Sequence, residues 1–122
     1  MSGRKSTNVV SYDNLPATPT IEHPEMVEFE RIYCIDESSF DGWEWNAIGN
    51  IYRGLPGALR FDAHNCPMWF GIKEDTPPFL WASAEPPGIQ VAGVLPLADW
   101  LAWDNAFSQA LEAAGIPFRD LS

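Results

Sequence analysis

Residues 97–118 read LADWLAWDNAFSQALEAAGIPF, and this stretch decides the fold class. Large apolar side chains recur in it every three or four residues, as on one face of a helix, at Trp100, Trp103, Phe107, Ala110, Leu111 and Ala114. Gly115 fits the left-handed position that ends a helix, and Ile116 would then fold back on Leu111. We predict a C-terminal helix that begins either at Pro96 or after Asp99.

Working toward the N-terminus, the pattern changes to short strands. From Met26 to Ile35 apolar and polar residues alternate, and further strands are indicated over 43–53, 58–63, 68–72, 79–84 and 89–95. Pro56 and Gly57 suit the two central positions of a type II turn, and Gly49 suggests a bulge or a close approach of two backbones. Five or six short antiparallel strands in a meander, with one helix packed on them, make a two-layer α+β domain.

The first 24 residues have a different composition. They carry Ser, Thr, Asn and three prolines without a periodic apolar pattern, which is typical of an extended arm. We therefore divide the chain into an extended N-terminal arm over 1–24 and a single α+β domain over 25–122. An arm of this kind could contact neighbours in a larger assembly such as a virion, so a structural subunit is one alternative function.

Charge narrows the choice of partner. The 122 residues include 17 acids and 7 Lys or Arg, for a formal net charge of −10. Nucleic acids and anionic membranes are bound through Lys and Arg, so this balance argues against both. Acids crowd residues 22–44, which is either a solvated face or a patch that steers a basic protein. Tryptophan is enriched at interfaces, and the predicted protein-binding residues are Glu28, Glu30, Asp36, Glu37, Asp41, Trp43, Glu44 and Trp45.

One stretch carries reactive residue types. Residues 61–70, FDAHNCPMWF, place Asp62, His64 and Cys66 at alternate positions. Pro67 favours a turn there, and no C-x2-C pair indicates a zinc site. A small enzyme that uses His64 and Cys66 stays a second alternative. The chain has no Gly-rich phosphate loop and no G-x-S-x-G motif, so we expect no cofactor.

These observations favour a non-enzymatic acidic protein-binding module, acting as an inhibitor, an antidote or an accessory protein on a basic protein surface. The composition is similar to that of small phage proteins and inhibitors of host enzymes. The start, MSGRKSTNVV, lacks the apolar core of a secretion signal, and Pro96 and Asp99 interrupt the most apolar segment. We expect reduced Cys34 and Cys66, and a location in the cytoplasm or in an assembled particle.

Overall fold

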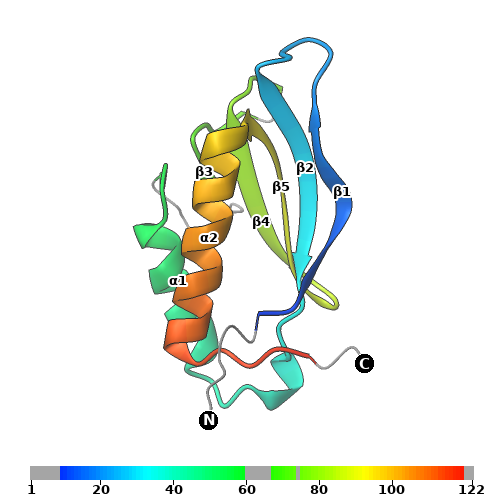
Figure 1. Cartoon of the computed structure of the whole chain (residues 1–122). Helices are drawn as coiled ribbons and strands as arrows, with labels where there is room; N and C mark the ends of the chain where they lie inside the picture. Colours follow the sequence, from blue (N-terminus) through cyan, green and yellow to red (C-terminus); the bar gives the residue numbers. More distant parts are fainter. Residues whose placement is uncertain (1–8, 60–66, 74, 120–122) are drawn as a thin grey trace.

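The computed structural model describes residues 9–59, 67–73 and 75–119. Five antiparallel strands form one sheet in the order β1-β2-β5-β4-β3. The strands are β1 (Ser11–Pro19), β2 (Met26–Tyr33), β3 (Met68–Trp69), β4 (Phe79–Glu85) and β5 (Gly88–Pro96). A short 3-10 turn, η1 (Glu37–Ser39), and two helices, α1 (Glu44–Gly54) and α2 (Leu97–Ala114), complete the described elements (Figure 1).

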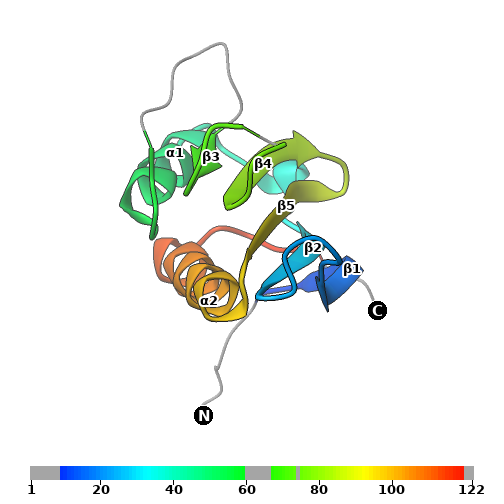
Figure 2. The same ribbon diagram turned by 90° about the horizontal axis from the view of Figure 1, so that it is seen from above.

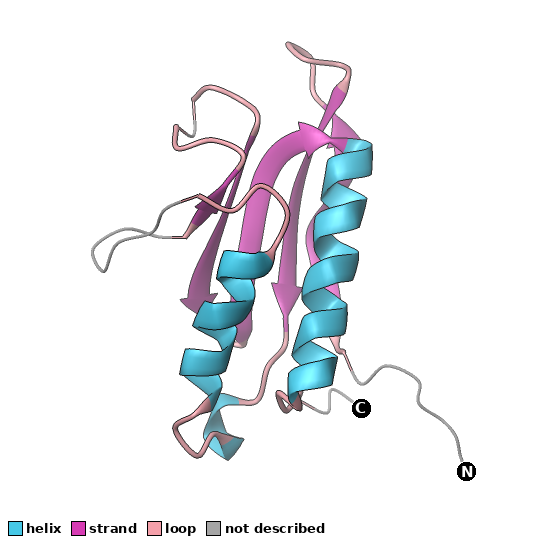
Figure 3. Cartoon of the chain, turned by 90° about the vertical axis from the view of Figure 1, so that its left-hand side faces the viewer, coloured by secondary structure: helices cyan, strands magenta, loops and turns pink. Residues whose placement is uncertain are grey.

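Both helices lie on the same face of the sheet (Figures 2 and 3). This is the two-layer α+β arrangement that the sequence predicts, with the C-terminal helix packed on an antiparallel sheet. No helix of the described residues covers the opposite face of the sheet. The helix-covered side holds the core, whereas the other side faces away from both helices.

The C-terminal helix ends as predicted. Gly115 has φ +75°, and its N–H donates to the Glu112 carbonyl oxygen at 3.1 Å. The Ile116 N–H reaches the Leu111 carbonyl oxygen, also at 3.1 Å, which closes a Schellman motif. At the other end the helix begins at Leu97, directly after Pro96, and Asp99 lies in its first turn. The observed start of the helix is therefore closer to the predicted start at Pro96 than to the one after Asp99.

Aromatic side chains fill the core between α2 and the sheet. Phe29 of β2 stacks on Trp100, with ring centroids 3.9 Å apart, and Trp69 of β3 meets Trp103 edge to face at 5.1 Å. Trp103 and Phe107 are fully buried. Burying such rings removes roughly 150 to 250 Å² each from water, so this cluster supplies much of the stabilisation. The prediction that Trp100 and Trp103 pack on the sheet is confirmed.

The predicted strand over 43–53 is wrong, because this segment forms helix α1. Side chains that it buries wholly or partly follow helical spacing, at Glu44, Ala47, Ile48, Ile51 and Tyr52, and Leu55 just after the helix continues the series. The alternation of Trp43, Glu44 and Trp45 suggests a strand, but three residues are too few to distinguish a strand from a helix. Gly49 accordingly lies inside a helix, where it marks neither a bulge nor a close approach of backbones.

The order of the strands also differs from a meander. β2 pairs with β5, because the chain leaves the sheet through η1 and α1 after β2 and returns at the far edge as β3.

The sheet also begins earlier in the sequence than expected. Residues 11–19, which the sequence assigns to an arm, form β1 and pair with β2 from Ser11 opposite Tyr33 to Pro19 opposite Val27.

The turn predicted at Pro56 and Gly57 is present. Gly57 has φ +75°, and the Ala58 N–H donates to the Leu55 carbonyl oxygen at 3.2 Å. This turn leads out of α1, not from one strand to the next. The tight turn after Glu85 joins β4 to β5. Most of the strand predicted over 58–63 lies outside the described residues; Ala58 forms an isolated bridge with Trp69.

Candidate protein-binding surfaces

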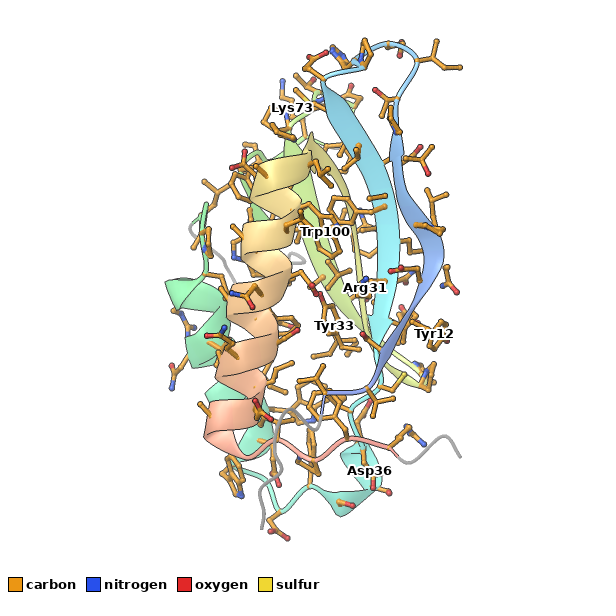
Figure 4. The ribbon with its side chains drawn as sticks, viewed as in Figure 1. Tyr12, Arg31, Tyr33, Asp36, Lys73 and Trp100 are labelled. Carbon is orange, nitrogen blue, oxygen red and sulfur yellow. The ribbon has the colours of Figure 1, made fainter. Side chains whose placement is uncertain are left out.

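The eight predicted protein-binding residues fall into two groups. Glu28 and Glu30 lie on β2, while the other six lie between residues 36 and 45, around η1 and the start of α1. Asp36 follows the end of β2, at the opposite end of the sheet from the turn that precedes this strand (Figure 4). The structure therefore gathers six of the eight residues at one site and places two at another.

Glu44 does not belong to the surface. Its side chain is buried, at 2% exposure, and its carboxylate accepts the backbone N–H groups of Asp41 and Gly42 at 2.9 Å. Burial opposes the charge, but the backbone N–H groups of residues 41–44 together outweigh it and hold the pKa of Glu44 below its ordinary value. The prediction that Glu44 contacts a partner is thus corrected, because its carboxylate fastens the chain that precedes α1.

Asp36 has a similar local role at η1 while keeping its charge near the surface. Its two carboxylate oxygens accept the hydroxyl groups of Ser38 and Ser39, at 2.5 and 2.6 Å. These two hydrogen bonds lower the pKa of Asp36. The turn therefore keeps a negative charge at neutral pH, next to the exposed side chain of Glu37.

Two tryptophans beside this turn are exposed. Trp43 is 47% exposed and Trp45 is 40% exposed, although an indole is normally buried in a domain of this size. The Trp45 ring packs edge to face on Phe40 with centroids 5.3 Å apart, so it rests on the fold. We call the surface formed by Asp36, Glu37, Asp41, Trp43 and Trp45 the acidic turn.

The second group of acids lies on the open face of the sheet. Val27 and Phe29 of β2 point into the core, so Glu28 and Glu30 point to the opposite face. Strand register aligns each of them with an aliphatic residue of β5 and an aromatic residue of β4. Glu28, Val94 and Phe79 form one row, and Glu30, Ala92 and Trp81 form the next.

These two rows border a groove. One hollow of about 240 Å³ is lined by both glutamates, Trp81, Phe79 and Leu15, among others. A second hollow, of about 610 Å³, shares Glu28 and Val94 with the first and continues to the turn between β1 and β2. We call the two hollows together the sheet groove. The sequence contains its signal, because Trp81, Ala92 and Val94 alternate with core residues, but their alignment depends on the β2–β5 pairing.

A charged network lies on the core side of β2. The Arg31 guanidinium contacts Asp13 of β1 at 2.7 Å and Asp104 of α2 at 3.0 Å, and it sits over the Trp100 ring at 5.6 Å (Figure 4). The Tyr33 hydroxyl donates to Asp104 at 2.5 Å. Burial, then the nearby Asp104 carboxylate, raises the pKa of Tyr33. Every group in this network has a partner, so it joins β1, β2 and α2.

Reactive side chains are scarce among the described residues. No group of three or more His, Cys, Asp or Glu is placed to hold a metal there. Cys34 is a buried free thiol whose pKa is raised by burial. Asp62, His64 and Cys66 lie outside the described residues. No described helix is both long and apolar enough to cross a membrane.

Comparison of the chain with known protein families, with curated proteins and with solved structures finds no match.

Proposed function

We propose that this chain is a non-enzymatic module that binds a protein with a basic surface through its acidic turn. Such a module would act as an inhibitor, an antidote or an accessory protein of that partner. The observation that carries the proposal is the exposure of Trp43 and Trp45 beside the acids of the turn.

Rigid aromatic side chains support this reading. Binding that immobilises flexible side chains costs free energy, so a surface that is already ordered binds more tightly. The buried Glu44 carboxylate fastens residues 41 and 42, and Phe40 supports the Trp45 ring. Both indoles are therefore presented by a turn whose backbone is held in place. Partly exposed tryptophans on such a support are the residues that most often dominate binding energy.

The charge of the chain supports a basic partner. Asp36, Glu37 and Asp41 carry negative charge around the tryptophans, within a chain of net charge −10. Complementary charge at the rim of an interface raises the association rate and selects among partners. The acids of the turn would thus provide rate and selectivity, while the indoles provide affinity.

Affinity capture with variants tests the proposal. Tagged wild-type protein and a Trp43→Ser/Trp45→Ser double variant are used as bait in extracts of cells that make the protein. We expect the wild type to retain a basic protein in stoichiometric amount, and the double variant to bind it at least roughly thirty-fold more weakly, since a hot-spot residue contributes 2 kcal/mol or more. Retained proteins are identified by mass spectrometry and affinities are measured with the purified partner.

A matched control removes exposed apolar surface elsewhere. Leu97 and Leu101 of α2 are 46% and 54% exposed, so Leu97→Ser/Leu101→Ser removes similar surface away from the turn. This control should bind the partner as the wild type does. Equal binding by the tryptophan double variant, or no stoichiometric partner for the wild type, would contradict the proposal.

A further inference from the structure

We propose that the sheet groove is a second binding site, and that it takes an extended segment of another protein with Lys or Arg at alternate positions. The site is independent of the acidic turn, since the two surfaces share no residue. The inference rests on two aligned rows of side chains across β2, β5 and β4. Each row contains an acid, an aliphatic side chain and an aromatic ring.

The spacing of the acids favours an extended occupant. Glu28 and Glu30 are two residues apart on one strand, so their side chains repeat at roughly 6.6 Å along β2. An extended peptide repeats its own alternate side chains at the same interval. Two basic side chains at positions i and i+2 of the occupant would thus meet both carboxylates. In a helix, neighbouring side chains follow a different repeat, so a helical occupant fits this spacing less well.

The width of the groove fits a single chain. Neighbouring strands are about 4.8 Å apart, so the glutamates on β2 and the rings on β4 stand about 10 Å from each other, across β5. Ala92 and Val94 on β5 are small and form a low floor between these walls. An extended segment lying over β5 would extend basic side chains toward β2 and place apolar groups against Phe79 and Trp81.

The charges of the groove select a basic occupant. Among the described residues its lining includes Glu22, Glu28 and Glu30, together with His23, and no Lys or Arg. The Glu28 carboxylate forms no hydrogen bond or ion pair with the described residues, and one oxygen of the Glu30 carboxylate accepts the Asn14 side-chain amide at 2.6 Å.

The test begins with a phage-displayed library of random linear 12-residue peptides, selected on the whole protein. We expect enriched peptides to carry Lys or Arg at alternate positions together with apolar residues. Synthesised binders should bind Glu28→Gln/Glu30→Gln roughly ten-fold more weakly than wild type, since two exposed ion pairs are lost. Binding should also weaken as NaCl rises from about 0.05 to about 0.5 M.

A matched control variant and an NMR map of the binding site complete the test. Glu37→Gln/Asp41→Asn removes two charges from the acidic turn and should leave the peptide affinity unchanged. Because Glu→Gln keeps the size of an exposed side chain, both variants are expected to fold, which circular dichroism verifies. In ¹H–¹⁵N spectra of the wild type, a bound peptide should shift signals of Glu28, Glu30 and Trp81.

Three results of the peptide experiments would overturn this inference. The first is that the selection enriches no basic peptides. The second is that selected peptides bind Glu28→Gln/Glu30→Gln as tightly as wild type. The third is that a bound peptide shifts only the signals of residues 36–45. The third result would leave the proposed function standing while removing the second site. Self-association that disappears in Glu28→Gln/Glu30→Gln, measured by analytical ultracentrifugation, would assign the groove to a second copy of the chain and so also overturn the inference.

Discussion

Glu44 shows how a single residue can look like a contact residue and act inside the fold. It lies between two exposed tryptophans in the sequence, yet its carboxylate is buried against the N–H groups of residues 41 and 42. Sequence alone predicts the charge of this residue but not its direction. The direction depends on the helical backbone that begins there, which turns Glu44 inward while its neighbours point out.

The pKa of Glu44 leads to a prediction at this scale. Because this pKa is lower in the folded chain than its ordinary value of 4.5, the carboxylate stabilises the fold above about pH 4.5, and the contribution is lost as pH falls further. Glu44→Gln should therefore lower the free energy of unfolding most at neutral pH. Urea unfolding of both proteins between pH 7 and about pH 3 measures the difference, which should shrink with acidification.

A matched substitution separates that effect from the general loss of one acid. Glu37 is exposed and has no fastening role, so Glu37→Gln should leave the unfolding free energy nearly unchanged across the same range. A difference between Glu44→Gln and wild type that stays constant with pH would refute the ionic role of Glu44.

At the scale of the element, the two helices differ in how readily the sequence reveals them. Over its 18 residues, α2 repeats its apolar spacing several times and ends in a glycine with its cap. The 11 residues of α1 follow Trp43 as N-cap, which makes no side-chain cap hydrogen bond, and they include two poor helix formers, Gly49 and Gly54. Local signals are therefore weak in α1, and packing of Ile48 and Leu55 into the core stabilises it as a helix.

Two glycine substitutions test this contrast. A Cβ at Gly115 meets no atom within 4 Å, so Gly115→Ala should cost about 1 kcal/mol purely through its positive φ. At Gly49, inside α1, a Cβ meets only the end of the Arg53 side chain at 3.7 Å, and Gly49→Ala should stabilise by up to about 1 kcal/mol. Thermal unfolding should show that Gly115→Ala lowers the stability and that Gly49→Ala raises it. Equal changes in stability would contradict the explanation from backbone conformation.

At the scale of the whole molecule, β1 makes the N-terminal segment part of the sheet, so its removal should affect the fold. The sequence predicts residues 1–24 as an arm outside the domain, yet β1 pairs with β2 from Tyr33 to Val27, with two register shifts, and Asp13 binds Arg31. The arm interpretation missed this because the strand has only one neighbour, and its mostly exposed side chains give no apolar alternation.

Deletion of residues 1–20 should therefore destabilise the protein. It removes β1, leaves the β2 edge unpaired and takes away one partner of Arg31. We expect the thermal midpoint to fall by at least about 5 °C and light scattering to rise as exposed edges associate. Deletion of residues 1–8, which keeps β1, is the control and should change the midpoint much less. Equal midpoints for the two deletions would contradict the role of β1.

The same deletion separates the two proposed surfaces. Leu15 lines the sheet groove and Asn14 contacts Glu30, so loss of β1 should weaken the binding of basic peptides. Neither Asn14 nor Leu15 belongs to the acidic turn. A partner held by Trp43 and Trp45 should still bind the truncated chain wherever it remains folded.

The sequence by itself determined the features that repeat within a short window: the C-terminal helix and its glycine cap, the strands β2, β4 and β5, the turns and the excess of acid. Only the tertiary structure decided the features that join distant segments, namely β1 at the edge, α1 as a helix, the burial of Glu44 and the alignment of Glu28 and Glu30 with the rings of β4. The physical reason is range: hydrophobic periodicity and backbone preference act over a few residues, whereas strand pairing and burial depend on which distant segment lies opposite.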